Sequence, residues 1–154
     1  MANPLGFNKI EANSLNGLSQ HLDNSNDQEV RCLLAEDNKV NQLIMTKMLG
    51  LFGINVECAS NGELALIKLK TSRYHFAIFD YEMPFKTGPD AVKEWRKQET
   101  GDRMPIVSWT TKNDSDSIKL CRESGMDIFL DKPCSKAKLR VALTTLGIIS
   151  KKDS

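Results

Sequence analysis

From residue 29 onward, the sequence alternates five times between a short apolar run and a segment with helical periodicity. Strands that are separated by single helices pair in parallel, because each helix returns the chain to the same end of the sheet. The pattern therefore predicts an α/β fold with a doubly wound, five-stranded parallel sheet and helices on both faces. The apolar runs are residues 30–36, 54–59, 74–80, 104–110 and 126–131, and the helical segments are 40–53, 63–70, 90–98, 114–124 and 135–147.

The chain of 154 residues has the length of one domain with short extensions. Residues 1–28 are rich in Asn, Ser, Gly and Leu and show no sustained period, so we expect a flexible N-terminal leader. We expect the domain itself to span residues 29–148, followed by a short C-terminal tail of residues 149–154.

The overall composition excludes several classes of function. With 21 Lys and Arg against 20 Asp and Glu, the net charge of +1 gives no general attraction to nucleic acid. No apolar stretch approaches the roughly 20 residues of a membrane span, and the N-terminus lacks a secretion signal. The four cysteines are scattered without a CxxC pair, which is typical of a reducing compartment. We expect a monomer in the cytoplasm, with the nucleus as an alternative location.

Acidic, hydroxyl and ammonium groups follow the ends of four predicted strands. The carboxyl ends of parallel strands meet at one edge of the sheet, which is where doubly wound folds bind ligands. A single Asp after a strand is usually a turn residue, but this combination predicts a functional site. The groups are Glu36 and Asp37 after the first strand, Asp80 after the third, Thr110 and Thr111 at the fourth, and Lys132 and Pro133 after the fifth.

This set of groups suits phosphoryl chemistry. Three crowded carboxylates repel each other unless a cation lies between them, and oxygen ligands favour Mg²⁺. A carboxylate is also a competent nucleophile toward phosphorus. Phosphoryl transfer needs mainly positioning and charge neutralisation, which Mg²⁺, the Lys132 ammonium and the Thr110 hydroxyl could supply.

Four motifs carry a resemblance to a known family: LLAEDN (33–38), FDYEMP (79–84), VSWTT (107–111) and FLDKP (129–133). Residues 30–147 resemble the receiver domain of response regulators in two-component phosphorelays. The resemblance implies a flavodoxin-like (βα)5 fold with strand order 2-1-3-4-5.

The resemblance also implies a role for each residue of the site. Asp80 would accept the phosphoryl group from a phosphohistidine on a histidine phosphotransfer protein or a histidine kinase. Mg²⁺ would be held by Asp37 and Asp80, with help from Glu36 partly through water and from the backbone carbonyl of Glu82.

The same resemblance assigns the remaining groups. Lys132 would pair with the phosphoryl group, and a cis peptide bond would fall at Lys132–Pro133. Thr110 would be the switch hydroxyl, and Phe129 the switch aromatic residue that rotates inward on activation.

The predicted helix 40–53 is the expected dock for a histidine-bearing helical partner. We expect Asn41 and Met45 to contact this partner, with Met45 on the less buried side of the helix, and Pro133 to join them. Trp109 is either a core residue or a further partner contact. One predominantly apolar face of the helix is traced by Val40, Leu43, Ile44, Lys47, Met48 and Leu51.

Glu82 and Lys112 lie two residues beyond Asp80 and Thr110, respectively. We hypothesise that they pair across the phosphoryl site and hinder the attacking water, which would slow the loss of phosphate. The alternative is a solvated surface pair of little consequence.

We therefore expect a phosphorelay switch or phosphate sink without an output domain, which catalyses its own phosphorylation. An alternative is a phosphohistidine phosphatase that acts through the same Asp80; related phosphohydrolases carry an acid/base Asp where this chain has Glu82. A third possibility is an interaction module without phosphorylation. The segments DYEMP and DKPCSKAKLR resemble stand-alone plant response regulators of the C type, whereas EDNKVNQ is equally typical of hybrid-kinase receivers.

Overall fold

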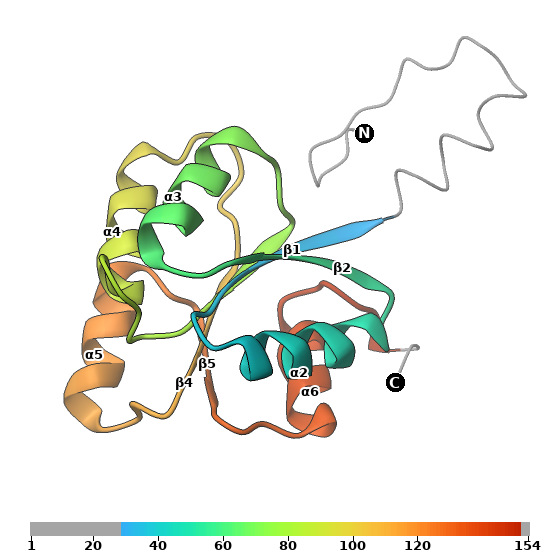
Figure 1. Cartoon of the computed structure of the whole chain (residues 1–154). Coiled ribbons are helices and arrows are strands. Elements are labelled where there is room, and N and C mark those ends of the chain that lie inside the picture. The colour runs from blue at the N-terminus through green and yellow to red at the C-terminus, as the bar shows by residue number, and fades with distance from the viewer. Residues whose placement is uncertain (1–28, 152–154) are drawn as a thin grey trace, which may run out of the picture.

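A computed structural model describes residues 29–151, and the predicted leader at residues 1–28 lies outside this range. The five predicted strands form one parallel sheet in the order β2-β1-β3-β4-β5, which confirms the expected topology (Figure 1). β1 is hydrogen-bonded to both β2 and β3. The strands are β1 (Val30–Ala35), β2 (Ile54–Ala59), β3 (Phe76–Phe79), β4 (Ile106–Thr110) and β5 (Ile128–Asp131).

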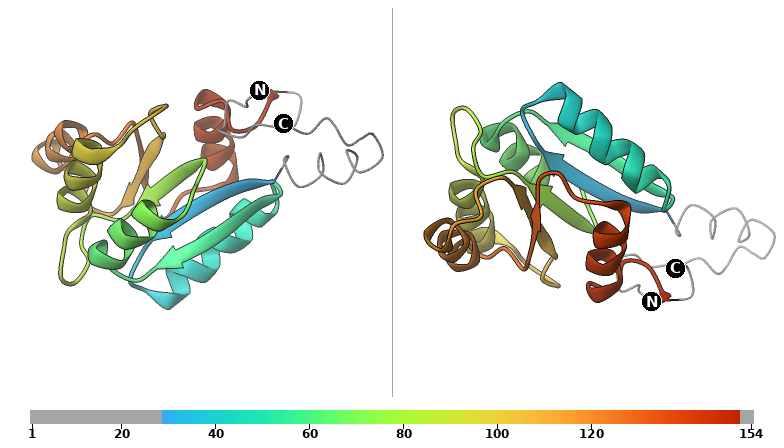
Figure 2. Two further views of the ribbon diagram at one scale, coloured as in Figure 1. Left: turned by 90° about the horizontal axis from the view of Figure 1, so that it is seen from above. Right: turned by 90° about the horizontal axis from the view of Figure 1, so that it is seen from below.

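Five helices cover the two faces of the sheet (Figures 1 and 2). α2 and α6 pack on one face, where Met45 and Leu139 join a core with Ile78. α3, α4 and α5 pack on the other face, where Leu69 and Val92 join a second core. The helices are α2 (Lys39–Gly50), α3 (Gly62–Thr71), α4 (Gly88–Gln98), α5 (Ser115–Ser124) and α6 (Lys136–Thr145).

Every helix begins at a residue whose side chain accepts a hydrogen bond from a backbone N–H three residues later. Such N-caps satisfy a donor that the first helical turn leaves free. The predicted cap Asn38 is among them, and it lies between the acidic residues of the β1 end and α2. The caps are Asn38, Asn61, Thr87, Asp114 and Ser135.

The apolar face that the sequence suggests for α2 points away from the core. Met45 and Leu49 are completely buried against the sheet. The α2 sequence carries two apolar stripes, and the direction of the helix axis over β1 and β2 selects the one with Met45. The other stripe stays 46–66% exposed and consists of Val40, Leu43, Ile44 and Leu51.

Candidate functional site

The carboxyl edge of the sheet brings three acidic residues together. Glu36 and Asp37 follow β1, and Asp80 follows the neighbouring strand β3. One oxygen from each carboxylate lies within 4.8 Å of the others. Glu36 and Asp80 are buried and Asp37 is exposed, so the cluster has an open side toward solvent.

Glu36 is held from several directions because it directly follows β1, a central strand of the sheet, at the carboxyl edge. Its N–H donates to the carbonyl of Ala59 at 2.9 Å. Its carboxylate accepts the backbone N–H of Asn38 at 3.0 Å and the Asn41 side-chain amide at 3.5 Å. The Gln42 amide donates to the Glu36 carbonyl at 2.6 Å. The first turn of α2 thus fixes this carboxylate.

Asp80 is oriented by its own backbone and by Lys132. Its N–H donates to the Ala35 carbonyl at 3.0 Å, which extends the pairing of β1 and β3. Its Oδ1 accepts the Tyr81 N–H at 2.7 Å, and its Oδ2 lies 3.0 Å from Lys132 Nζ. A β-carbon at Gly88 would lie 2.0 Å from the Asp80 carbonyl oxygen. Only glycine therefore lets α4 begin this close to Asp80.

Lys132 reaches back over the cluster from the end of β5. Its Nζ lies 2.5 Å from Glu36 Oε1 and 3.0 Å from Asp80 Oδ2. It also lies over the Trp109 ring, 4.9 Å from the centroid. The peptide bond Lys132–Pro133 is cis, as expected.

The charges of this cluster do not balance. Three carboxylates, from Glu36, Asp37 and Asp80, face the single ammonium of Lys132. A surplus of two negative charges on oxygen ligands at this spacing fits a divalent cation such as Mg²⁺. The three clustered carboxylates are among the predicted magnesium ligands, and the part of the Glu82 carbonyl stays a prediction.

The family model of the response regulator receiver domain matches residues 32–144. The chain belongs to this family. Of this receiver domain's relatives, the osmosensing histidine protein kinase SLN1 of Saccharomyces cerevisiae is 41% identical over 128 residues, covering 79% of this chain and 10% of the kinase. Hybrid signal transduction histidine kinase G of Dictyostelium discoideum is 36% identical over 126 residues, covering 80% of this chain and 4% of the kinase. The chain thus spans a tenth or less of these two relatives.

Solved structures of receivers share the fold. The receiver domain of a sensor histidine kinase from Pseudomonas aeruginosa PAO1 has a TM-score of 0.71 and 32% identity, covering 76% of this chain and 96% of that one. That structure contains a magnesium ion coordinated in its active site cleft. Chemotaxis protein CheY4 of Vibrio cholerae has a TM-score of 0.71 and 27% identity, covering 76% of this chain and 98% of that one. The likeness to stand-alone plant regulators stays a prediction.

The two expected switch residues of the receiver domain lie on β4 and β5. Thr110 is buried at the end of β4, and its hydroxyl accepts the Lys112 N–H at 3.1 Å. Phe129 is half-buried in β5, with the Arg122 guanidinium 4.8 Å from its ring centroid. Both side chains thus lie in the layer formed by β4, β5 and α5.

Glu82 and Lys112 form the expected ion pair, with 3.2 Å between Oε2 and Nζ. The hydrogen bond to Glu82 raises the pKa of Lys112 above its ordinary value, so the ammonium is charged at neutral pH. The Lys112 ammonium also lies 5.6 Å from the centroid of the Tyr81 ring. The pair therefore connects the loops that follow Asp80 and Thr110.

Of the expected partner contacts, Met45 is wrong, and for Trp109 the core alternative holds, because both side chains are inaccessible. Met45 is completely buried, on the side of α2 that faces the sheet. Trp109 is 2% exposed and belongs to the core between the sheet, α2 and α6. Asn41 is half-buried beside Glu36, and Pro133 is exposed at the site's rim. The contact between Trp109 and Lys132, and the packing of Gly88 on Asp80, were missed at the sequence level.

Proposed function

We propose that this receiver domain accepts a phosphoryl group on Asp80 from a phosphohistidine of a histidine kinase or histidine phosphotransfer protein. One observation carries the proposal: the Asp80 carboxylate lies at the edge of an acidic cluster with Lys132 Nζ 3.0 Å away. In the reaction, an Asp80 oxygen forms the new bond to phosphorus while the bond between phosphorus and the imidazole nitrogen breaks. The electron pair of that bond leaves with the imidazole.

The chain's own groups prepare Asp80 for this reaction. The Tyr81 N–H holds Oδ1, which leaves Oδ2 as the attacking oxygen once Lys132 turns toward the incoming phosphoryl group. Lys132 then neutralises a phosphoryl oxygen, and the Thr110 hydroxyl donates to another. Preorganised donors of this kind stabilise the charge of a transition state at small cost in reorganisation.

Mg²⁺ is the cofactor we assign to the acidic cluster. Asp37 and Asp80 would hold it directly, the Glu82 carbonyl would complete the site, and Glu36 would act through water. Bound there, Mg²⁺ would supply positive charge to neutralise phosphoryl oxygens beside Asp80. The Glu36 carboxylate already pairs with Lys132 in a buried contact. This favours an indirect role for Glu36 in metal binding, through water.

The exposed apolar stripe of α2 is the surface we assign to the phosphodonor. It begins beside Glu36 and Asp37, so a helix that presents a phosphohistidine to Asp80 would lie against Val40, Leu43 and Ile44. Apolar anchors near the centre of an interface supply most of the affinity in such contacts. Asn41 and the exposed Pro133 would border this surface.

Binding of phosphate would then change the surface that partners read. A phosphorylated Asp80 attracts the Thr110 hydroxyl, and Phe129 follows into the space that Thr110 leaves. The movement selects one of two arrangements of β4, β5 and α5, because the phosphoryl group makes contacts in only one of them. The domain would act as a relay or a phosphate sink according to how long the phosphate lasts.

Radiolabel transfer from a phosphorylated histidine phosphotransfer protein tests the proposal. We expect a Mg²⁺-dependent label on the wild type that is stable in acid and lost in base, and no label on Asp80→Asn. Asp131→Asn is a matched control, because Asp131 ends the neighbouring strand β5 but is exposed and pairs with Asn113 at 3.1 Å. Label on Asp80→Asn, or none on the wild type with several donors, would overturn the proposal.

A further inference from the structure

The most unusual neighbour of the phosphoacceptor site is a buried tryptophan. Trp109 lies in β4 directly before Thr110 and is 2% exposed. Its side chain belongs to the core that β4 shares with α2 and α6. The Lys132 ammonium lies over its ring, 4.9 Å from the centroid. The Lys132 ammonium therefore packs against the face of the Trp109 ring.

The environment makes this contact strong. Indole has the most favourable ring face for a cation, and the attraction grows when water is excluded. The Lys132 side chain is 11% exposed, so little solvent competes with the ring. Its ammonium also meets Glu36 at 2.5 Å and Asp80 at 3.0 Å, which leaves the ring to cover a further side of the same cation.

Core packing alone does not account for an indole at this position. Trp109 Nε1 is buried, and its side-chain partner among residues 29–151 is the Cys134 thiol, a weak acceptor that satisfies an indole N–H poorly. Trp95 in α4 also has a buried Nε1, without a hydrogen-bond partner in this part of the chain, but the cation–ring contacts found there do not include the Trp95 ring. The two tryptophans thus differ in that the Trp109 ring contacts the Lys132 ammonium.

We propose that Trp109 is a positioning residue that keeps the Lys132 ammonium at the acidic cluster. A lysine side chain has four rotatable bonds and loses much conformational freedom when it is fixed. The ring limits the ammonium to the space between Glu36, Asp80 and the indole face. The consequence for phosphoryl transfer rests on the function proposed above, whereas the consequences for Lys132 and for Mg²⁺ do not.

The proposal predicts opposite effects on metal binding and on transfer. Lys132 competes with a divalent cation for the same carboxylates, so loosening the lysine should strengthen Mg²⁺ binding. Phosphoryl transfer should slow, because the ammonium is less often in place. General damage to the site would instead weaken Mg²⁺ binding and slow phosphoryl transfer together.

The experiment compares Trp109→Leu, which removes the ring, with Trp109→Phe, which keeps a smaller one. Trp95→Leu is the control for the loss of a largely buried indole, because Trp95 lines a cavity with Glu99 and Arg103 away from the acidic cluster. Three quantities are measured for each variant: the chemical shift of the Lys132 ε-methylene protons, the Mg²⁺ dissociation constant by calorimetry, and the rate of labelling by acetyl phosphate.

In the wild type, we expect the indole ring to shift the Lys132 ε-methylene signal upfield. This upfield shift should be smaller in Trp109→Phe and absent in Trp109→Leu. Labelling of Trp109→Leu should be about 5- to 30-fold slower, the range expected for a desolvated cation–ring contact. Its Mg²⁺ affinity should be equal or higher, and Trp95→Leu should match the wild type in all three quantities.

A folded Trp109→Leu that keeps the Lys132 shift and the labelling rate would overturn the inference. If Trp109→Leu does not fold, the partial shift and intermediate rate expected of Trp109→Phe decide the matter. A wild type that shows the ring shift but takes no label, either from acetyl phosphate or from phosphorylated histidine phosphotransfer proteins, would instead refute the proposed function, while the role of Trp109 toward Lys132 would stand.

Discussion

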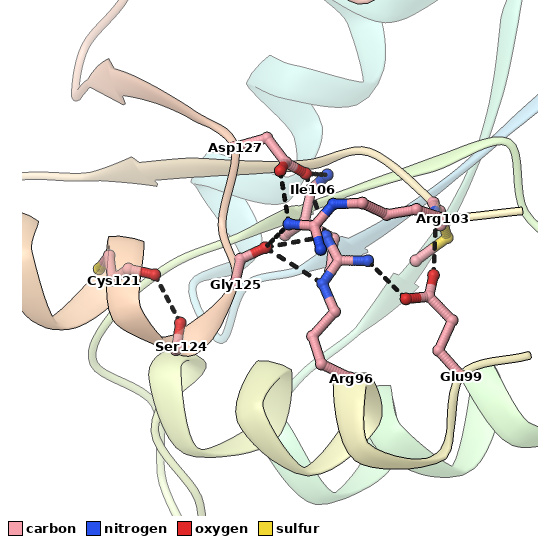
Figure 3. A network of polar contacts seen from close by, with 9 residues as sticks. Arg96, Glu99, Arg103, Ile106, Cys121, Ser124, Gly125 and Asp127 are labelled. Carbon is pink, nitrogen blue, oxygen red and sulfur yellow. Dashed lines mark hydrogen bonds and ion pairs between the residues drawn. The ribbon is translucent and has the colours of Figure 1, made fainter.

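The sheet has a charged cluster near each of its two edges, and the two clusters differ in charge balance. At the carboxyl edge, Lys132 pairs with Glu36 and Asp80, and Asp37 adds a third carboxylate. At the amino end, two arginines and two acidic residues form a closed network between α4, β4 and the turn before β5 (Figure 3). These four residues are Arg96, Glu99, Arg103 and Asp127.

The carboxylates of the amino-end network also accept backbone N–H groups. Asp127 accepts the Ile106 N–H at 2.9 Å, and Glu99 accepts the Met104 N–H at 2.7 Å. Arg96 binds both carboxylates, at 2.8 Å for Glu99 and 3.0 Å for Asp127. It also donates to the Gly125 carbonyl at 2.8 Å, as Figure 3 shows. Equal numbers of cations and anions with satisfied oxygens hold α4 to the start of β4 and β5.

The comparison separates a structural cluster from a reactive one. A balanced network with full hydrogen bonding has nothing to gain from an added ion. The carboxyl-end cluster has surplus negative charge and an open side at Asp37, so an incoming cation lowers its energy. The number of charges at the two ends is similar, and the difference lies in their sum.

The largest effect is expected for Lys132→Met, which removes the only cation of the reactive cluster. Phosphoryl transfer should slow by at least about a hundredfold, because a preorganised charge that meets the phosphoryl group is lost. Without Mg²⁺, the free energy of unfolding should fall by about 3 kcal/mol, since the buried Glu36 carboxylate loses its cation. Label transfer and urea unfolding with and without Mg²⁺ measure both, and Mg²⁺ should restore part of the stability.

Arg96→Ala should act on stability alone. It removes a cation that is 11% exposed and pairs with two carboxylates, so we expect a loss of about 2–3 kcal/mol in the free energy of unfolding. Arg103→Ala is the matched control: it pairs with the same Asp127 but is 58% exposed, so its loss should stay below about 1 kcal/mol. A folded Arg96→Ala with slowed phosphoryl transfer would contradict the separation of the two ends.

The fold and the reactive cluster could be predicted from the sequence because both follow from local patterns. Alternating strands and helices determine a parallel sheet, and a parallel sheet brings the residues after its strands to one edge. Asp80 and Lys132 are separated by half a domain in sequence, yet each is found by the same rule. The amino-end network lacked such a signal, because Arg96, Glu99 and Arg103 look like ordinary surface charges of a helix and loop.

The burial of particular side chains could not be predicted in the same way. All five residues of β4 are buried, so the alternation that distinguishes two strand faces gave no indication of where Trp109 lies. In α2, two apolar stripes compete, and only tertiary packing decides that Met45 rather than Ile44 faces the sheet. The open alternative at Trp109 and the error at Met45 both concern which of two apolar surfaces is buried, and hydrophobicity alone does not distinguish them.

The ion pair of Glu82 and Lys112 should control how long the reactive cluster keeps its phosphate. Glu82→Ala and Lys112→Ala should each speed hydrolysis of the Asp80 phosphate about two- to fivefold, the modest size expected for an exposed pair. Decay of isolated labelled protein measures the rate. Lys119→Ala, which removes an exposed lysine of α5, is the control. Unchanged decay in both variants would mean that the pair is a solvated surface ion pair without effect on the phosphate.

The smallest effect is expected at a third, exposed cluster in which Glu57 pairs with Arg31 and Lys68. The hydrogen bond from Lys68, followed by that from Tyr74, lowers the pKa of Glu57 below 4.5. A lowered pKa contributes stability above the unfolded-state pKa, and this contribution is lost as the pH falls through the folded-state pKa.

Glu57→Gln should therefore lower the free energy of unfolding at neutral pH by less than about 1 kcal/mol, because the Glu57 side chain is 38% exposed. The difference from the wild type should shrink as the pH falls through the lowered pKa of Glu57. Urea unfolding at neutral and acidic pH measures this difference. Glu63→Gln is the control, because within residues 29–151 Glu63 has a single ion pair, with Lys86 at 3.8 Å. An equal loss at both pH values would mean that Glu57 acts through packing, because ion pairs with Arg31 and Lys68 should weaken when the carboxylate is protonated.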